Sequence, residues 1–516
     1  MALFINKNYS LYFINQFTNN MFNRFLSLLI VCLSFSSSGF SQSGHKIEIA
    51  LANYDQDKLM LGYHYGDKQY IKDSVKIADG KFIFENEEAL DPGVYLVVMP
   101  PDNQYFQLLI DKDQHFTVTT DAKNPNQKMQ IDGSKDNKLF YDYMAYLGKK
   151  RPMADQLKKE LGTATGANKT AIQQQLNELN VEVQSYQNNL ISQNASSLTT
   201  ALVKSGLEAP IPKFEGTEKE IQLKRYHHFK AHYFDNIDLG DERLVRSPIL
   251  FQRIDYYMNK LTVQVPDSIN KSVDYILEKA KPADATFKYY LVHFLNTYAQ
   301  SKVVGMDGVY VHIAEKYYAT GQAPWTDEEQ LAKITENAKT LKPILIGKTA
   351  PDLKMFEIDI EGTLGAENDE NEYKRWRAKK EITLHGVDAP YTVLFVWDPD
   401  CGHCKKSMPK MVEFYENYKD KGVEVFAVCT KTYEEMNACA KTMKEKGIVN
   451  WINAIDPFIK SNYKLIYDIK STPQIFILDE NKEIISKKIG AEQLADVMDR
   501  IFEMKKQKQG NSGSSK

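Results

Sequence analysis

The chain has 516 residues, of which 43% are hydrophobic and 11% aromatic, so it is globular rather than disordered. This length exceeds what one hydrophobic core usually spans and predicts about two to four domains. The formal net charge of -3 excludes a nucleic-acid partner that is held by bulk positive charge.

Residues 1–42 have the pattern of a signal peptide. Arg24 precedes an apolar stretch at 25–35, and small polar residues follow it. The stretch is too short to favour a transmembrane helix, although an uncleaved anchor is the alternative. Translation from Met21 would give the leader a more ordinary length. We therefore expect a mature protein that is soluble and lies outside the cytoplasm, where disulfides persist.

Residues 45–133 contain short segments in which apolar and polar side chains alternate. About eight strands at this spacing predict an antiparallel β-sandwich-like accessory domain. Asp79 and Gly80 predict a tight turn that joins residues 69–77 and 81–84 as a hairpin. Since no constellation of nucleophilic side chains stands out, we expect a docking or accessory module here.

Residues 137–345 carry apolar side chains at helical spacing, which predicts an all-α helical domain. Gly162 and Gly166 are expected to interrupt its first long helices. His228 and His232 are four residues apart and present a metal-like pair on one face. Because lysines and an arginine surround them and no third ligand is evident, we expect a solvated basic face and no metal.

Residues 347–506 alternate strands with helices, which predicts an α/β domain with a sheet of mixed direction. Residues 451–455 are expected to form a short edge strand, and 457–467 a helix. The polar tail at 507–516 is expected to be disordered. The other expected strands are 353–357, 382–384, 391–396, 422–429, 474–479 and 483–488.

The cysteine motif lies between a buried strand at 391–396 and a helix at 405–418. This places Cys401 at a helix N-terminus, where backbone N–H groups and the helix dipole favour a thiolate. His403 adds a cation when it is protonated. The spacing lets Cys404 reach Cys401, which predicts a redox-active disulfide between the two. The motif is Trp397-Asp398-Pro399-Asp400-Cys401-Gly402-His403-Cys404.

Several motifs in residues 347–506 match a known family. They are Ala350-Pro351-Asp352, Phe395-Val396-Trp397 before Cys-x-x-Cys, Met408-Pro409, the strand 422–428 and Thr472-Pro473. With them, the segment resembles the thioredoxin-like superfamily, most closely the TlpA/ResA-type thiol-disulfide oxidoreductases of the bacterial envelope. The Cys-Gly-His-Cys tetrad also resembles protein disulfide isomerase domains, whose pairs are more oxidising than thioredoxin.

The resemblance assigns roles to individual residues. Cys401 is implied to be the exposed nucleophile and Cys404 the buried resolving thiol. Thr472 and Pro473 are implied to form a cis peptide that faces the disulfide and pairs with a bound substrate strand. Trp397 and Gly402 complete the motif, and Pro409 is implied to kink the helix.

The proton acceptor for Cys404 is left unassigned by this resemblance. Phe395 stands where thioredoxin has a buried aspartate, and Ser407 stands where ResA-type proteins have an acid. Glu424 is the candidate, because a carboxylate in a buried strand is costly unless it has a role. An outward-facing strand position is the equal alternative.

The charges beside Cys401 leave its ionisation open. Asp398 and Asp400 oppose a thiolate, whereas His403 and the helix dipole favour it. Asp398 also argues against peroxidase chemistry, because a peroxiredoxin would place threonine at that position.

The remaining cysteines, Cys429 and Cys439, are too far apart in sequence for a zinc knuckle. We expect two buried free thiols there, with a second disulfide as the alternative. No metal and no cofactor are therefore predicted.

The predicted function is exchange of disulfides with protein substrates outside the cytoplasm. The resemblance implies the periplasm or cell envelope of a Gram-negative bacterium, a membrane redox partner, and a place in cytochrome c biogenesis or envelope redox homeostasis. The alternatives are an envelope binding protein whose thioredoxin-like domain only docks, and a peroxiredoxin-like thiol peroxidase. The direction of electron flow and the substrate are left open.

Overall fold

The computed structural model describes residues 44–364 and 380–513, so the predicted signal peptide lies outside the described residues. By its internal packing the described chain forms two compact units. The first contains residues 44–62 and 71–179, and the second contains residues 63–70 and 180–513. None of the helices in the described ranges is long and apolar enough to cross a membrane.

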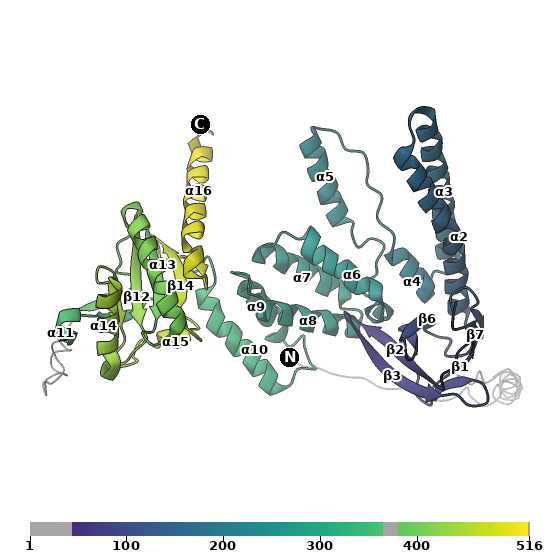
Figure 1. Ribbon diagram of the computed structural model, residues 1–516, viewed down its shortest axis with the longest axis horizontal. Helices are drawn as coiled ribbons and strands as arrows, with labels where there is room; N and C mark the ends of the chain where they lie inside the picture. The colour runs from purple at the N-terminus through teal and green to yellow at the C-terminus, as the bar shows by residue number, and fades with distance from the viewer. Residues whose placement is uncertain (1–43, 365–379, 514–516) are drawn as a thin grey trace, which may run out of the picture. The chain divides into compact units, whose positions relative to one another are not determined.

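The N-terminal region is built from two four-stranded sheets, ordered β4-β1-β7-β8 and β3-β2-β5-β6 (Figure 1). This agrees with the predicted β-sandwich-like domain. However, β1 and β7 run parallel, with Ile47 opposite Phe116, so the domain is not wholly antiparallel. The strands are β1 (His45–Ala52), β2 (Lys58–Tyr65), β3 (Lys68–Lys76), β4 (Phe82–Asn86), β5 (Gly93–Met99), β6 (Gln104–Ile110), β7 (His115–Asp121) and β8 (Gln130–Asp132).

The turn at Asp79 and Gly80 forms as predicted, with φ values of 49° and 77°, and Ala78 pairs with Lys81. The predicted hairpin is wrong, because β3 and β4 belong to different sheets. The chain crosses from one sheet to the other at this turn. Alternation identifies a strand but not its partner, and β4 pairs with β1 instead.

The middle of the chain is helical, as predicted. Gly166, at φ 56°, begins α3 after a break, whereas Gly162 lies inside α2. The helices are α2 (Lys135–Thr163), α3 (Gly166–Gln193), α4 (Leu198–Ser205), α5 (Glu218–Ala231), η1 (Glu242–Arg246), α6 (Pro248–Tyr256), η2 (Tyr257–Leu261), α7 (Pro266–Ala280), α8 (Asp284–Ala299), α9 (Asp307–Ile313), η3 (Ala314–Tyr318), α10 (Glu328–Leu341) and η4 (Lys342–Ile344).

His228 of α5 and the C-cap residue His232 both have protein partners. A ring nitrogen of His228 lies 3.1 Å from the carbonyl of Pro210, and His232 pairs with Asp235 at 2.7 Å. Across the described residues, no group of three or more potential ligands is arranged to hold a metal ion.

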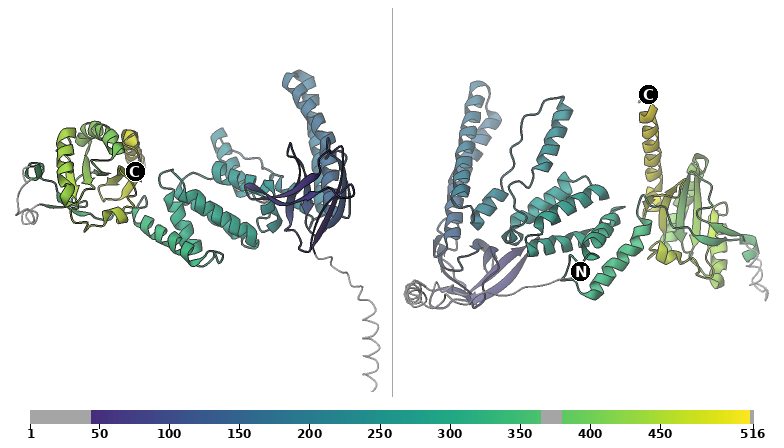
Figure 2. Two further views of the ribbon diagram at one scale, coloured as in Figure 1. Left: turned by 60° about the horizontal axis from the view of Figure 1, so that its bottom comes forward. Right: turned by 180° about the vertical axis from the view of Figure 1, so that it is seen from behind.

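The C-terminal domain has a seven-stranded sheet, ordered β10-β9-β13-β12-β11-β14-β15, with helices around it (Figure 2). Its strands are β9 (Lys354–Glu357), β10 (Glu381–Thr383), β11 (Tyr391–Trp397), β12 (Val423–Cys429), β13 (Ile452–Ile455), β14 (Gln474–Asp479) and β15 (Ile484–Lys487). Its helices are α11 (Ile360–Leu364), α13 (Gly402–Tyr418), η5 (Lys419–Lys421), η6 (Tyr433–Glu435), α14 (Met436–Lys446), α15 (Tyr463–Ile466), η7 (Ala491–Gln493) and α16 (Leu494–Gly513).

Three local predictions in this domain are wrong. β13 lies inside the sheet rather than at its edge, and the Asn453 amide is satisfied there by the carbonyls of Ile448 and Trp451. The predicted helix at 457–467 shrinks to α15, because Ile459 has φ 54°, which no helix accommodates. The helix α16 continues through residue 513, so residues 507–513 are helical where a disordered tail was predicted.

Strand β11 lies inside the sheet, between β12 and β14, and is buried along its whole length. It runs parallel to β12 and antiparallel to β14. Val393 and Phe395 pack in one core with α13, while Leu394 and Val396 pack in the core on the other face. Because side chains pack on both faces of β11, the position of its backbone is fixed. The turn that carries the cysteine motif therefore begins at a defined place at the edge of the sheet.

Candidate functional site

Cys401 is the N-cap residue of α13, with φ -75° and ψ 120°. Its Sγ accepts a hydrogen bond from the backbone N–H of Cys404 at 3.3 Å. The predicted helix start is therefore correct, and the sulfur occupies the place that a capping oxygen normally takes. The N–H groups of the first helical turn converge on Sγ, which favours negative charge there.

Cys404 lies directly behind Cys401 and is 1% exposed, whereas Cys401 is partly exposed. The backbone N–H of Asp398 donates to the Sγ of Cys404 at 3.4 Å. Both residues are free thiols, so the structure represents the reduced form of the pair. The exposed and buried positions are those that a nucleophile and a resolving thiol require.

The two thiols differ in pKa. Burial acts to raise the pKa of Cys401, but hydrogen bonds from the Thr472 side chain and from the Cys404 backbone outweigh it and bring the pKa below its ordinary value. Burial raises the pKa of Cys404 to about 12. Near neutral pH, Cys401 is thus the sulfur that ionises, and Cys404 remains a thiol until it reacts.

The Thr472–Pro473 peptide is cis, as the resemblance implies, and it lies beside the redox pair. The Thr472 carbonyl accepts a hydrogen bond from the Sγ of Cys401 at 3.2 Å. Strand β14 begins immediately afterwards, with Gln474 opposite Val396 of β11. Strand pairing therefore brings together two segments that are about 70 residues apart in sequence.

The other motif residues differ in exposure. His403 is exposed in the first turn of α13, and its backbone hydrogen bond helps to lower the pKa of Cys401. Gly402 is exposed too, and a Cβ at this position would meet nothing within 4 Å. Trp397 is 1% exposed, and it packs with Cys404 in the core rather than presenting its ring to a substrate.

Glu424 does not lie near Cys404, so its candidacy as proton acceptor is wrong. It lies opposite Thr392, near the start of β11, whereas Trp397 at the other end lies opposite Cys429. Five residues of strand separate the two ends, or about 17 Å. The Glu424 carboxylate instead accepts from the Tyr415 hydroxyl at 3.5 Å. Its side chain is half-buried there, near the start of β12.

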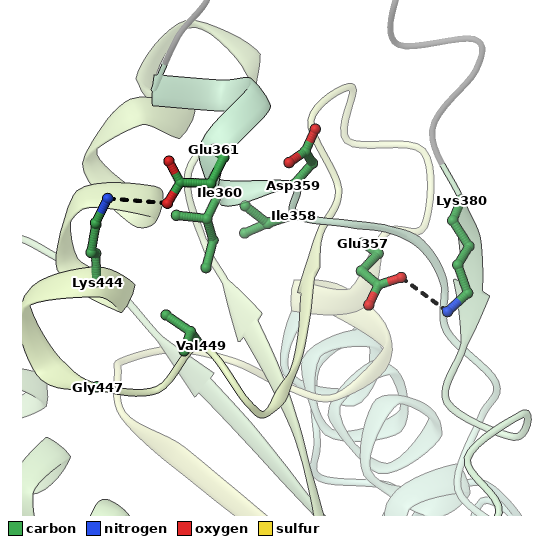
Figure 3. A pocket seen from close by; sticks show the side chains of 9 residues that line it. All are labelled: Glu357, Ile358, Asp359, Ile360, Glu361, Lys380, Lys444, Gly447 and Val449. Atoms are coloured by element: carbon green, nitrogen blue, oxygen red, sulfur yellow. Dashed lines mark hydrogen bonds and ion pairs between the residues drawn. The ribbon is translucent and has the colours of Figure 1, made fainter.

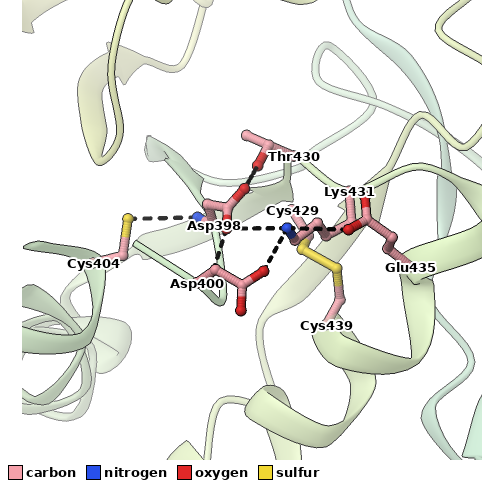
Figure 4. Close-up of a disulfide and its surroundings, with 8 residues drawn as sticks. All are labelled: Asp398, Asp400, Cys404, Cys429, Thr430, Lys431, Glu435 and Cys439. Carbon is pink, nitrogen blue, oxygen red and sulfur yellow. Dashed lines mark hydrogen bonds and ion pairs between the residues drawn. A yellow bond between two sulfur atoms is a disulfide. The ribbon is translucent and has the colours of Figure 1, made fainter. Parts of the chain in front are cut away.

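A charged cluster beside the motif is not predicted by the sequence (Figure 4). The Nζ of Lys431 lies 2.6 Å from Asp400, 3.5 Å from Asp398 and 3.5 Å from Glu435. Thr430 donates from its hydroxyl to the Asp398 carboxylate at 2.6 Å. The cluster could have been predicted from the order of the strands. Because β11 and β12 are neighbouring parallel strands, residues just beyond their carboxyl ends meet.

Cys429 and Cys439 form a disulfide with an S–S distance of 2.01 Å, which overturns the expectation of free thiols (Figure 4). Cys429 ends β12, Cys439 lies on α14, and their exposures are 1% and 0%. Burial of both positions was predicted correctly. That the two side chains face each other depends on how α14 crosses the sheet, which spacing along the chain does not encode.

A cavity of about 830 Å³ lies elsewhere in the domain, between the 357–361 segment and α14 (Figure 3). Two of its carboxylates are paired with lysines: Glu357 with Lys380 and Glu361 with Lys444, each at 3.0 Å. No cysteine or histidine lines it. It therefore adds nothing to the redox pair.

Three families match consecutive parts of the chain. Residues 347–501 match the Redoxin family. Residues 45–140 match DUF4369 and residues 164–342 match DUF5106, which are both domains of unknown function.

Relatives match the C-terminal domain in particular. The thiol-disulfide oxidoreductase ResA of Bacillus cereus (strain ZK / E33L) is 29% identical over 161 residues, which cover 30% of this chain and 78% of the relative. A solved domain of a possible thiol-disulfide isomerase from Cytophaga hutchinsonii is 32% identical; the match covers 32% of this chain and 97% of that one, with a TM-score of 0.26. A thioredoxin-like protein from Bacteroides caccae is 17% identical; the match covers 56% of this chain and 96% of that one, with a TM-score of 0.40.

The α/β sheet, the Cys-x-x-Cys pair at a helix N-terminus and the cis proline beside it define the thioredoxin-like class. Together with the Redoxin match, they make the C-terminal domain a thioredoxin-like domain. This domain is similar to the TlpA/ResA-type thiol-disulfide oxidoreductases, and β-rich and helical regions precede it in the chain.

Proposed function

We propose that the chain exchanges disulfides with protein substrates outside the cytoplasm, through the Cys401–Cys404 pair. One observation carries the proposal. Cys401 is a partly exposed thiol with a lowered pKa, and its Sγ accepts a hydrogen bond from the backbone of Cys404, a buried thiol whose pKa is about 12. The Cys401 sulfur is suited to attack as a thiolate, and the Cys404 sulfur is suited to remain a thiol until a mixed disulfide has formed.

In the reducing direction, the Cys401 thiolate attacks one sulfur of a substrate disulfide. The other substrate sulfur leaves as a thiolate and takes up a proton, and a mixed disulfide joins Cys401 to the substrate. Cys404 then loses its proton and attacks the Sγ of Cys401, which breaks the mixed disulfide and releases the second substrate thiol. Two electrons pass to the substrate, and a Cys401–Cys404 disulfide remains. The same steps in reverse oxidise a dithiol.

Thr472 and Pro473 are proposed to receive the substrate backbone. Their peptide lies next to the Cys401 sulfur and just before β14, where an extended segment has access to backbone groups. A substrate strand bound there would place its own sulfur near Cys401.

The proposed location is the periplasm or cell envelope of a Gram-negative bacterium, reached through the signal peptide of residues 1–42. A reductase in that compartment needs an electron donor, and we propose a membrane redox partner for this role. Cytochrome c biogenesis and envelope redox homeostasis are the proposed processes. The β-sandwich-like domain and the helical domain are proposed to dock partners or substrates.

The test is reduction of insulin disulfides by the full-length mature chain, with dithiothreitol as the electron source. We expect turnover by the wild type and none by Cys401→Ser. Cys429→Ala/Cys439→Ala is the matched control, because it removes two buried sulfurs that the mechanism does not use. If the wild type gave no turnover while both proteins captured the same envelope partner, a binding role would replace the enzymatic one.

A further inference from the structure

We propose that Lys431 is a positioning residue that neutralises the two aspartates beside Cys401 and so keeps the surroundings of the reactive sulfur favourable to negative charge. The inference deepens the proposed function and rests on it for its consequence in exchange. Its electrostatic part concerns Cys401 alone and can be measured without any substrate.

The two aspartates are held close to Cys401. Asp400 directly precedes it, and the Cys401 N–H donates to the Asp398 carbonyl at 3.2 Å. The Asp400 N–H also donates to the Asp398 carboxylate at 2.8 Å, so both residues are fixed in one turn. Two uncompensated carboxylates at this position would repel a thiolate and raise the pKa of Cys401.

Lys431 reaches these carboxylates from the end of the neighbouring strand (Figure 4). Its Nζ lies within 4 Å of Asp398, Asp400 and Glu435, and its side chain is 12% exposed. An exposed ion pair is screened by water and salt, but a mostly buried lysine with several partners is screened less. The positive charge of Lys431 therefore offsets the charges of Asp398 and Asp400 in the turn that leads into Cys401.

The same cluster also fixes the backbone that contacts Cys404. Thr430, next to Lys431, donates its N–H to the Trp397 carbonyl at 2.9 Å and its hydroxyl to Asp398 at 2.6 Å. The Asp398 N–H in turn donates to the Sγ of Cys404 at 3.4 Å. The Cys429–Cys439 disulfide ties down the chain two residues before Lys431. Through Asp398, Lys431 thus connects the end of β12 with the backbone of Cys401 and with the sulfur of Cys404.

Other charged and titratable groups lie around this edge of the domain. Burial raises the pKa of Tyr463, and the charges of Asp456 and Asp398 raise it further. Tyr463 and Asp456 therefore lie in the same electrostatic environment as Asp398. Within the described residues, Lys431 is the cation whose contacts join Asp398 to Asp400. The groups on neighbouring elements are His403, Lys405 and Lys406 on α13, Glu435 on η6, and Asp456, Tyr463 and Lys464 around α15.

The experiment measures the ionisation of Cys401 in Lys431→Met. The reduced full-length chain is alkylated with iodoacetamide over a range of pH, and labelling of the Cys401 peptide is followed by mass spectrometry. We expect the pKa of Cys401 to rise by about one unit, which means an alkylation rate about tenfold lower below that pKa. Lys444→Met is the matched control, since Lys444 forms an exposed ion pair with Glu361 and, among the described residues, none with the aspartates of the motif; it should leave the profile unchanged.

A rescue variant separates charge from structure. Adding Asp398→Asn and Asp400→Asn to Lys431→Met removes the charges that Lys431 offsets, so the pKa of Cys401 should return toward the wild-type value. A purely structural role for Lys431 would leave the pKa raised in the triple variant and would overturn the proposal. An unchanged pKa in folded Lys431→Met would overturn it as well.

Asp400→Asn alone keeps the proposal testable if Lys431→Met does not fold. With Lys431 present and one carboxylate removed, alkylation of Cys401 should become faster at a pH below its pKa, and an unchanged or slower rate would contradict the inference. Insulin reduction provides the independent readout. If the wild type did not reduce insulin, the proposed function would fail while the alkylation profiles still decided the role of Lys431.

Discussion

Two cysteine pairs lie at the same edge of one domain, yet their chemistry differs. Cys401 and Cys404 are free thiols at the start of a helix, whereas Cys429 and Cys439 form a disulfide inside the core. The first pair has one exposed sulfur surrounded by N–H donors, and the second pair is closed to solvent on all sides. Access and hydrogen-bond donors, rather than the presence of two cysteines, separate a redox centre from a structural crosslink.

The largest expected effect comes from Cys404→Ser. Without the resolving thiol, the mixed disulfide between Cys401 and the substrate cannot be released by the chain itself. We expect the reduced chain, freed of dithiothreitol, to react once with insulin and to accumulate a covalent adduct that is visible on a non-reducing gel and is reversed when dithiothreitol is added. Cys439→Ser changes a sulfur of the other pair and should trap no adduct. A trapped adduct there would mean that both pairs exchange.

Loss of the second pair should act on stability instead. The disulfide spans 10 residues, and Cys429→Ala/Cys439→Ala should lower the free energy of unfolding of the C-terminal domain by about 2–3 kcal/mol. Urea denaturation, followed by near-UV circular dichroism of the full chain, measures this change. Insulin reduction at a temperature where the variant is folded should stay within about twofold of wild type, since neither sulfur touches the reacting pair. A large loss of turnover with full stability would reverse the two assignments.

The pH dependence of alkylation should distinguish the two thiols of the redox pair. The pKa of Cys401 is lowered and that of Cys404 is raised to about 12, so the reduced chain should be labelled at Cys401 well before Cys404 near neutral pH. The rate at Cys401 should rise with pH and then level off once its lowered pKa is passed, because the thiolate is the reactive form. Equal labelling of both residues at neutral pH would contradict the proposed division of roles.

The two pairs also differ in how much of their surroundings could be predicted from the sequence. The helix start at Cys401 follows from local signals, namely a buried strand, a turn and apolar side chains at helical spacing. The partners of Cys429 and Asp398 come from other elements, and they meet because β12 is parallel to β11 and α14 crosses behind it. Resemblance supplied Thr472 and Pro473 because their motif is short and contiguous. It supplied nothing for Lys431, whose role depends on two carboxylates in the turn after β11 and on Glu435 of η6.

For Glu424, a local rule gave a wrong prediction, namely that it is the proton acceptor for Cys404. A carboxylate within an apolar strand draws attention as a buried base, but alternation of side chains and the strand register put it near Tyr415. Glu424 is half-buried near the start of β12, and a charged side chain that still reaches water is accommodated there without a catalytic role.

The smallest expected effect therefore belongs to Glu424→Gln. This change keeps the shape and the ability to accept from the Tyr415 hydroxyl while it removes the charge, and the site lies about 17 Å from the redox edge. Insulin reduction and the pH profile of Cys401 alkylation should both stay within about twofold of wild type, since that distance exceeds the Debye screening length of about 10 Å. Asp398→Asn is the informative partner variant, because Asp398 contacts Cys404 through its backbone and carries one of the charges that Lys431 offsets. A shift of the profile in Glu424→Gln and none in Asp398→Asn would place proton transfer at the far end of β12, and would remove the electrostatic argument for the cluster beside the cysteines.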